Sequence, residues 1–291
     1  MPSQYVHGHH PKDEISLLDL WKVIEGNRKI IFYLSLITTT IALIIAILST
    51  PVYRAESLLS PVTKDGGNKL SALAGQFGGL ASLAGIDLGG GSSAVEAIEI
   101  LKSRDFIIKF IESEKLMPVL YESLWDAEKK IWKDNVKVPS ILKAYEKFSK
   151  SVQKVSVDPK TTLVTLAIEW KDPEKAADWT IKLVERINDK LRSEAIAESE
   201  KSIQYLENEL KETSVIDIKQ SIYNLIEAQA KNKMLANTRQ EFAFRVIDSA
   251  VVPEERVRPN RKLIVLFGML IGVILGIFVG FFRHFLRQSS E

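Results

Sequence analysis

The sequence predicts an α+β membrane protein in which two transmembrane helices flank one water-soluble domain with a small membrane-proximal mixed sheet and long projecting helices. Residues 30–48 and 263–282 are apolar runs without a charged side chain. At a rise of about 1.5 Å per residue, each run forms a helix that can cross the hydrocarbon core of a bilayer. Residues 49–262 are polar enough for water, and they contain both alternating and helical patterns.

The composition excludes several classes of function. A net charge of +2 does not favour nucleic acid, whose recognition needs a strongly basic face. The absence of cysteine excludes structural disulfides, Fe–S clusters and thiol catalysis. Three of the four histidines are His7, His9 and His10, in a tail that we interpret as too loose to hold a metal. We therefore expect no catalytic residues, no cofactor and no metal site, and thus no enzyme.

The N-terminal part of the chain predicts a short tail and a retained anchor. Residues 1–29 form the tail, and apolar positions within 13–24 indicate an amphipathic helix at the membrane surface with Trp21 at headgroup depth. Residues 30–48 form the first transmembrane helix. A cleaved signal peptide is disfavoured because mostly polar residues precede this run and the run is long for a signal sequence.

A strand and a glycine-rich segment follow the first anchor. Residues 52–59 alternate and are rich in β-branched and apolar side chains, which predicts a strand leaving the membrane. Residues 70–93 contain many glycines, but no Gly-Lys-Ser/Thr sequence follows them, so we predict no nucleotide site. We expect this segment to be mobile and to lie near the membrane or a neighbouring subunit.

Several short elements are predicted next. Helical spacing predicts helices over 95–101, 105–116, 121–132 and 140–150, with Ser103 as an N-cap. Two alternating runs, 152–157 and 162–170, flank the turn Asp158-Pro159-Lys160, which predicts a β-hairpin.

A long helix is predicted over about 173–212. Asp172 is an N-cap candidate, Pro173 suits the first helical position, and neither Pro nor Gly occurs again before residue 213. Such a helix is about 60 Å long, so its polar middle projects into solvent or packs on a copy of itself. Candidate glycan or subunit contacts there, which are otherwise a solvated face, are Arg192, Glu194, Glu198, Lys201 and Gln204.

The chain then returns to the membrane. We expect a break at 213–215, a second helix to about residue 241 and a last strand over 244–252. Pro253 and Pro259 form a membrane-proximal proline motif, which is either a restraint on the backbone or simply a stiff linker.

The second transmembrane helix, 263–282, carries glycine at every fourth position. Gly268, Gly272, Gly276 and Gly280 form a smooth stripe that lets another helix approach closely. Residues 283–291 form a short tail. Lys and Arg are almost balanced across both anchors, so the positive-inside rule only slightly favours both termini in the cytoplasm.

Three features together resemble the Wzz-type chain-length determinants, also called polysaccharide co-polymerases. They are the acidic, Leu/Trp-bearing start at 13–21, the sequence Pro51-Val52-Tyr53-Arg54-Ala55 after the first anchor, and the prolines before a glycine-striped second anchor. The family usually has more prolines, often with Ser-Pro-Lys, whereas this chain has Arg258-Pro259-Asn260. This form also occurs in exopolysaccharide and capsule relatives.

The resemblance implies a non-catalytic regulator of surface polysaccharide chain length, such as that of O-antigen lipopolysaccharide. It implies a bacterial inner-membrane homo-oligomer with cytoplasmic termini 1–29 and 283–291 and a periplasmic domain over 49–262. The implied partners are a Wzy-type polymerase and the growing lipid-linked glycan. Relatives fused to a tyrosine autokinase carry a nucleotide site, and this sequence has no P-loop.

Two other functions compete with this interpretation. An adaptor for capsule or exopolysaccharide export with an ABC transporter would share the two-anchor layout. A two-anchor sensor would need an output domain, for which we expect residues 1–29 and 283–291 to be too short.

Overall fold

The computed structural model describes residues 25–62 and 91–288, which form two compact units. One unit combines residues 25–51 and 257–288, and the other combines residues 52–62 and 91–256. The predicted surface helix at 13–24 and nearly all of the glycine-rich segment lie outside the described residues.

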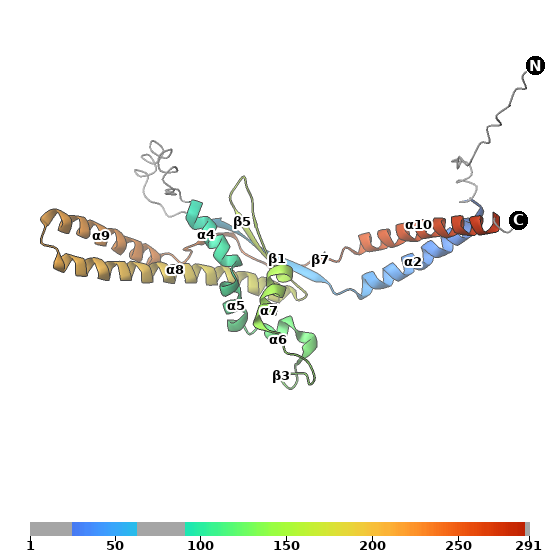
Figure 1. The fold of residues 1–291 in the computed structure, drawn as a ribbon, viewed down its shortest axis with the longest axis horizontal. Helices are drawn as coiled ribbons and strands as arrows, with labels where there is room; N and C mark the ends of the chain where they lie inside the picture. The colour runs from blue at the N-terminus through green and yellow to red at the C-terminus, as the bar shows by residue number, and fades with distance from the viewer. Residues whose placement is uncertain (1–24, 63–90, 289–291) are drawn as a thin grey trace, which may run out of the picture. The chain divides into compact units, whose positions relative to one another are not determined.

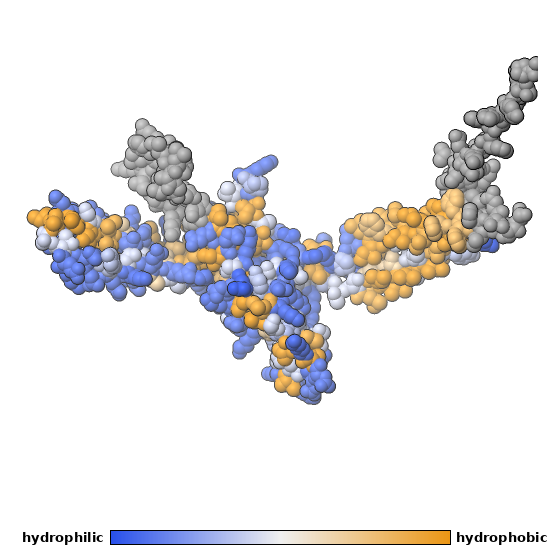
Figure 2. Space-filling model, in the orientation of Figure 1, coloured by the Kyte–Doolittle hydropathy of each residue, from blue (hydrophilic) through white to orange (hydrophobic). Residues whose placement is uncertain are grey.

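The first unit contains the two long apolar helices. Helix α2 spans Arg28–Leu48 and helix α10 spans Arg261–Gln288, and the two pack against each other. By length and composition both can cross a membrane, and Figure 2 shows their apolar surface. The predicted positions of the two apolar helices are therefore confirmed.

The second unit is built around a small sheet. Its strands run in the order β4 (Gln153–Val157), β5 (Val164–Trp170), β1 (Val52–Pro61) and β6 (Phe244–Asp248). The three pairs between these strands are antiparallel, whereas we had predicted a mixed sheet. A short strand, β7 (Arg256–Arg258), falls at the boundary of the two units.

Strand β6 is shorter than the predicted strand over 244–252. Its register with β1 shifts between Leu58 and Leu59. Beyond this irregularity the backbone N–H of Ala250 donates to the Ser57 hydroxyl at 2.9 Å instead of to a β1 carbonyl. A hydrogen bond to a side chain thus takes the place of the backbone hydrogen bond between the strands, and β6 ends at Asp248.

Short helices pack on the sheet and build the core. They are α4 (Gly91–Lys102), α5 (Arg104–Ser113), α6 (Met117–Leu120) and α7 (Ile141–Lys147), the last continuing into a π-helical turn over Phe148–Val152. The Ser103 hydroxyl accepts from the Phe106 N–H, as its predicted N-cap role requires. Large side chains fill the core, among them Phe106, Phe110, Phe148, Leu183 and Ile187.

The helix predicted over 121–132 is wrong. A 3-10 turn (Glu122–Leu124) leads into a hairpin of β2 (Trp125–Asp126) and β3 (Ile131–Trp132). The two indole rings stand edge to face with centroids 5.1 Å apart. Their seven-residue spacing also fits two turns of helix, so periodicity alone could not separate the two structures.

Two long helices form an antiparallel arm. Helix α8 spans Pro173–Glu212 and helix α9 spans Ile216–Thr238, with the predicted break between them. Only the first half of α8 contributes buried side chains to the core, and its second half pairs with α9 beyond the sheet (Figure 1). The predicted long helix is confirmed, including its first residue after the Asp172 cap.

Candidate functional site

The first half of helix α8 packs on the sheet by one face. Apolar side chains such as Leu183 and Ile187 are fully buried toward the core. Between them and the start of the helix, Thr180 donates to the carbonyl of Ala176 at 2.7 Å and approaches the carbonyl of Ala55 at 3.4 Å. The adjacent side of this half of the helix carries cations at positions 182, 186 and 190, one turn apart, and faces α5.

These cations line a groove of about 590 Å³ between α5 and α8, the α5–α8 groove. It is open to solvent and lined by four cations, three carboxylates, a hydroxyl and one aromatic ring. The lining residues are Phe106, Lys109, Glu114, Lys182, Glu185, Arg186, Asp189, Lys190 and Ser193.

Two contacts cross from one wall of the groove to the other. Lys182 Nζ lies 2.9 Å from Glu114 Oε2, and the Arg186 guanidinium donates to the Ser113 hydroxyl. Hydrogen bonds to Glu114 and Asp178 raise the pKa of Lys182. Lys182 is therefore tied to two carboxylates, whereas the contact of Arg186 across the groove is with a neutral hydroxyl.

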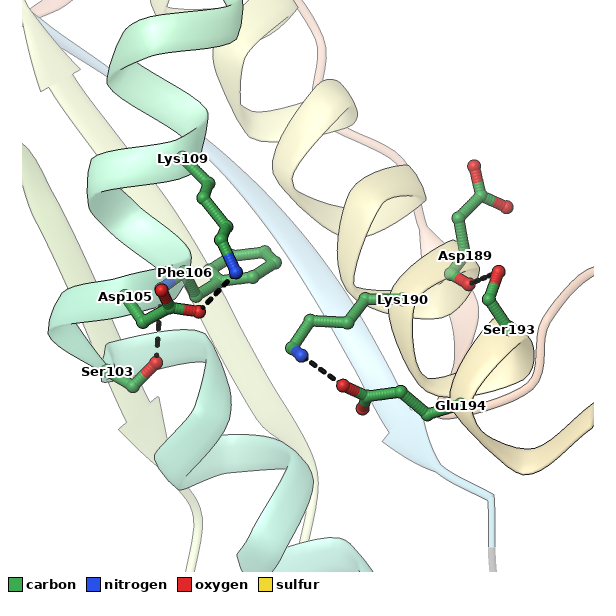
Figure 3. A network of polar contacts seen from close by, with 8 residues as sticks. All are labelled: Ser103, Asp105, Phe106, Lys109, Asp189, Lys190, Ser193 and Glu194. Carbon is green, nitrogen blue, oxygen red and sulfur yellow. Dashed lines mark hydrogen bonds and ion pairs between the residues drawn. The ribbon is translucent and has the colours of Figure 1, made fainter. Parts of the chain in front are cut away.

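At the other end of the groove, the lysine of each helix pairs with a carboxylate on the same helix (Figure 3). Lys109 lies 2.9 Å from Asp105 on α5, and Lys190 pairs with Glu194 on α8. The pKa of Asp105 is lowered by its hydrogen bond to Lys109, with a smaller effect of the Lys190 charge from the opposite wall. The Lys190 side chain reaches toward α5 in Figure 3, so cations from both helices border the groove.

The contacts predicted on α8 lie just beyond this groove. Arg192 donates to Asp189 at 2.8 Å, and Glu194 accepts from Lys190. Glu198, Lys201 and Gln204 are exposed on the half of α8 that pairs with α9. Their role as glycan or subunit contacts remains a proposal.

Sequence reasoning missed the α5–α8 groove, although one signal for it was present. Cations at positions 182, 186 and 190 recur every four residues, which places them on one face of a helix. The opposite wall could not be predicted, because the sequence does not say which helix packs beside that face.

The paired half of the arm joins α8 to α9 through small and aliphatic side chains. Ser199 of α8 and Ile222 and Ala236 of α9 are buried. Lys233 Nζ lies 2.9 Å from Glu200 Oε1 and links the two helices at their edge.

The glycine stripe of α10 lies against α2 of the same chain. A Cβ added at Gly268 would lie 2.3 Å from Ala42 Cβ, and one at Gly272 would lie 2.6 Å from Ser35 Cα. A Cβ at Gly276 would lie 2.7 Å from Ile31 Cα, and Gly280 lies beside Asn27. The two backbones approach more closely than any larger residue allows, so this stripe is used within the chain.

The proline motif is divided between the two units. Pro253 lies between β6 and β7, and Pro259, which follows a cis peptide bond, lies just before α10. Among the described residues, no group of three or more His, Cys, Asp or Glu side chains is arranged to hold a metal ion.

The N-terminal part of the chain matches a known family model. Residues 13–114 match the model described as Wzz, chain length determinant protein. Residues 13–114 therefore resemble a Wzz-type domain. The matched region includes α2, β1, α4 and α5, and it ends at Glu114, on one wall of the groove. The resemblance inferred from the sequence is thereby confirmed.

Residues 208–285 match a second model, described as "G-rich domain on putative tyrosine kinase". This region covers α9, β6 and the glycine stripe of α10. A search of curated protein sequences gives no match.

Solved polysaccharide co-polymerases also align with the chain at low similarity. A full-length bacterial co-polymerase aligns over 94% of this chain and 99% of its own, with 11% identity and a TM-score of 0.43. A fragment of WzzB from Salmonella Typhimurium aligns over 72% of this chain and 100% of its own, with 13% identity and a TM-score of 0.32. A point mutant of the Shigella flexneri lipopolysaccharide O-antigen chain-length regulator aligns over 70% and 99%, with 11% identity and a TM-score of 0.22.

Proposed function

We propose that this protein regulates the length of a bacterial surface polysaccharide and does not itself catalyse sugar transfer. The observation that carries the proposal is the Wzz match over residues 13–114, which includes the first apolar helix and one wall of the α5–α8 groove. The second apolar helix at the other end of the chain is consistent with the two-anchor layout of such regulators.

The proposal includes a location and partners. We propose that the protein lies in the inner membrane, with both termini in the cytoplasm and residues 49–262 in the periplasm. It assembles with copies of itself and works beside a Wzy-type polymerase on a lipid-linked glycan. The arm of α8 and α9 supports this role, because a helix of about 60 Å offers a long polar surface to a neighbour or a polymer.

In mechanistic terms, we infer that the oligomer holds the polymerase and the growing glycan until release becomes more favourable than extension. No bond needs to be made or broken by the regulator itself. The required property is differential binding of short and long chains, which shifts the balance between extension and release.

A second candidate function is coupling of capsule or exopolysaccharide synthesis to export. The observation behind it is the match of residues 208–285 to the model described as a G-rich domain on a putative tyrosine kinase, the type of relative that the sequence comparison with capsule proteins also suggested. A gene neighbourhood with an ABC transporter, and without a Wzy-type polymerase, would support this alternative.

The deciding experiment is an electrophoretic profile of surface polysaccharide from cells in which the gene is deleted and then restored. Chain-length control predicts that deletion replaces a clustered band distribution with a smooth decay of short chains. Glycan that is lost from the surface but accumulates inside the cell would favour the export function. An unchanged ladder, with the protein verified as expressed in the parent strain, would contradict both.

A further inference from the structure

The cations of the α5–α8 groove differ in the groups that they contact. Lys182 is held by Glu114 and Asp178, both at 2.9 Å, which accounts for it as a structural link between the walls. Arg186 differs, because its contact across the groove is the Ser113 hydroxyl, a neutral acceptor. A guanidinium carries five donors in a planar fork that matches a carboxylate, so this contact leaves most of its donors for a ligand.

At the end of the groove away from Lys182, both walls contribute positive charge. Lys109 and Lys190 each pair with a carboxylate one turn away on their own helix, and no ion pair joins these two walls at this level among the described residues. Pairs of this kind on a solvated helix contribute little to stability. A ligand carboxylate can therefore take the place of the protein carboxylate in either pair at small cost.

The groove also has acceptors, which a simple anion site does not need. Glu185, Asp189 and Ser193 line the same groove from α8. A sugar ring presents several hydroxyl groups that both donate and accept, so a mixed lining of carboxylates, cations and a hydroxyl suits it better than it suits an inorganic anion. The volume of about 590 Å³ is within the range of small-molecule sites.

We propose that the α5–α8 groove binds a carboxylate-bearing sugar residue of a polysaccharide, with the carboxylate on Arg186 and Lys190 and the sugar hydroxyls on Glu185, Asp189 and Ser193. This inference rests on the proposed function, because it identifies the class of glycan that the regulator contacts. It places the contact at the base of the arm, where α8 lies on the sheet, and not on the exposed positions 198–204.

The test is a binding titration with the full-length protein in nanodiscs. The probes are trigalacturonic acid, which is acidic, maltotriose, a neutral trisaccharide, and inorganic phosphate. The variant is the double substitution R186Q/K190Q, which shortens both side chains, keeps them polar and removes both charges. Lys211→Gln on the same helix is the matched control, because the Lys211 ammonium contacts the Asn208 amide and lies at the far end of the arm from the groove.

The expected result is binding of trigalacturonic acid that weakens about tenfold or more in R186Q/K190Q and stays unchanged in K211Q, since one charged hydrogen bond is equivalent to about a tenfold change in affinity. Thermal unfolding of each variant checks that it is folded. Arg186→Lys should retain part of the affinity for trigalacturonic acid, because it keeps the positive charge. Equal binding of maltotriose, binding of phosphate alone, or an equal loss in K211Q would overturn the proposal.

The binding titration and the gene deletion together separate this inference from the proposed function. If gene deletion changes the polysaccharide ladder while no trigalacturonic acid binds, chain-length control stands and the groove proposal fails. If the acid binds through Arg186 and Lys190 while deletion leaves the ladder unchanged, the site stands and the proposed function fails.

Discussion

Asn188 shows how one side chain fixes the return of the chain to the sheet. Its carboxamide oxygen accepts from the backbone N–H groups of Ala243 and Phe244 at 2.7 and 2.8 Å, and its nitrogen donates to the Phe244 carbonyl at 3.0 Å. The side chain is buried, and buried backbone groups left without partners cost free energy. The start of β6 is thus held by α8 and not only by β1.

A charged cap begins the long helix in a similar way. Asp172 accepts from the N–H groups of Glu174 and Lys175 at 3.1 and 3.2 Å. Burial raises the pKa of this carboxyl, but hydrogen bonds from the backbone of Lys175 and Glu174 and the charge of Lys175 outweigh it, so the pKa lies below its ordinary value of 3.8. The ionised form is therefore favoured by folding.

The sign of the pH dependence follows from this shift. A carboxyl whose pKa is lower in the folded state stabilises the protein above its unfolded pKa, and this contribution is lost as the pH falls through the folded value. We expect the urea midpoint of the full chain in detergent to fall on acidification below about pH 4, and Asp172→Asn to reduce that fall while remaining a good cap. Asp134→Asn, at an exposed position, is the control. An identical pH profile in the Asp172 variant would contradict this.

At the scale of elements, the arm illustrates what sequence could and could not predict. The bounds of α8 were predictable because Asp172, Pro173 and the absence of later breakers act locally. The hairpin over 125–132 was not, because the positive φ of Lys130 and the edge-to-face contact of Trp125 with Trp132 depend on folded geometry. The groove was missed for the same reason, since its two walls are far apart in sequence.

The pairing of the arm depends on small side chains at the helix contact. Ala236 of α9 is fully buried, and Ser199 of α8 is nearly so. We expect Ala236→Leu to cost about 1–3 kcal/mol, because a larger side chain overpacks a close contact. Hydrogen exchange should then accelerate in α9 and in the second half of α8, while β1 and β5 remain protected.

Ala228→Leu is the control for this prediction, since Ala228 lies on the same helix and is exposed. Equal acceleration in both variants would mean that leucine perturbs α9 through something other than its contact with α8. Acceleration that extends to β5 would mean that the arm and the sheet open as one cooperative unit.

At the scale of the whole molecule, helices α2 and α10, which are far apart in the sequence, form one pair. The α10 glycines face α2, and Thr38 lies where a side chain at Gly272 would fall, 2.0 Å from its added Cβ. Since this stripe is occupied within the chain, any contact between copies along these helices would use other faces of α2 and α10. Figure 2 shows that the outer surface of this pair is largely apolar.

We therefore expect Gly272→Ala to separate α2 from α10 before it alters any assembly. The added methyl would lie 2.6 Å from the Ser35 backbone, which cannot rotate away, so the change should cost about 1–3 kcal/mol and shift the pair roughly tenfold toward separation. The chain has no cysteine. The Arg261 guanidinium lies 3.5 Å from the Ile47 backbone carbonyl, so cysteines introduced at these two positions can be joined by a short bismaleimide. Crosslinking within one chain should fall in Gly272→Ala and persist in Val279→Leu, an exposed position. Unchanged crosslinking with a smaller oligomer would instead assign the glycine face to contacts between copies.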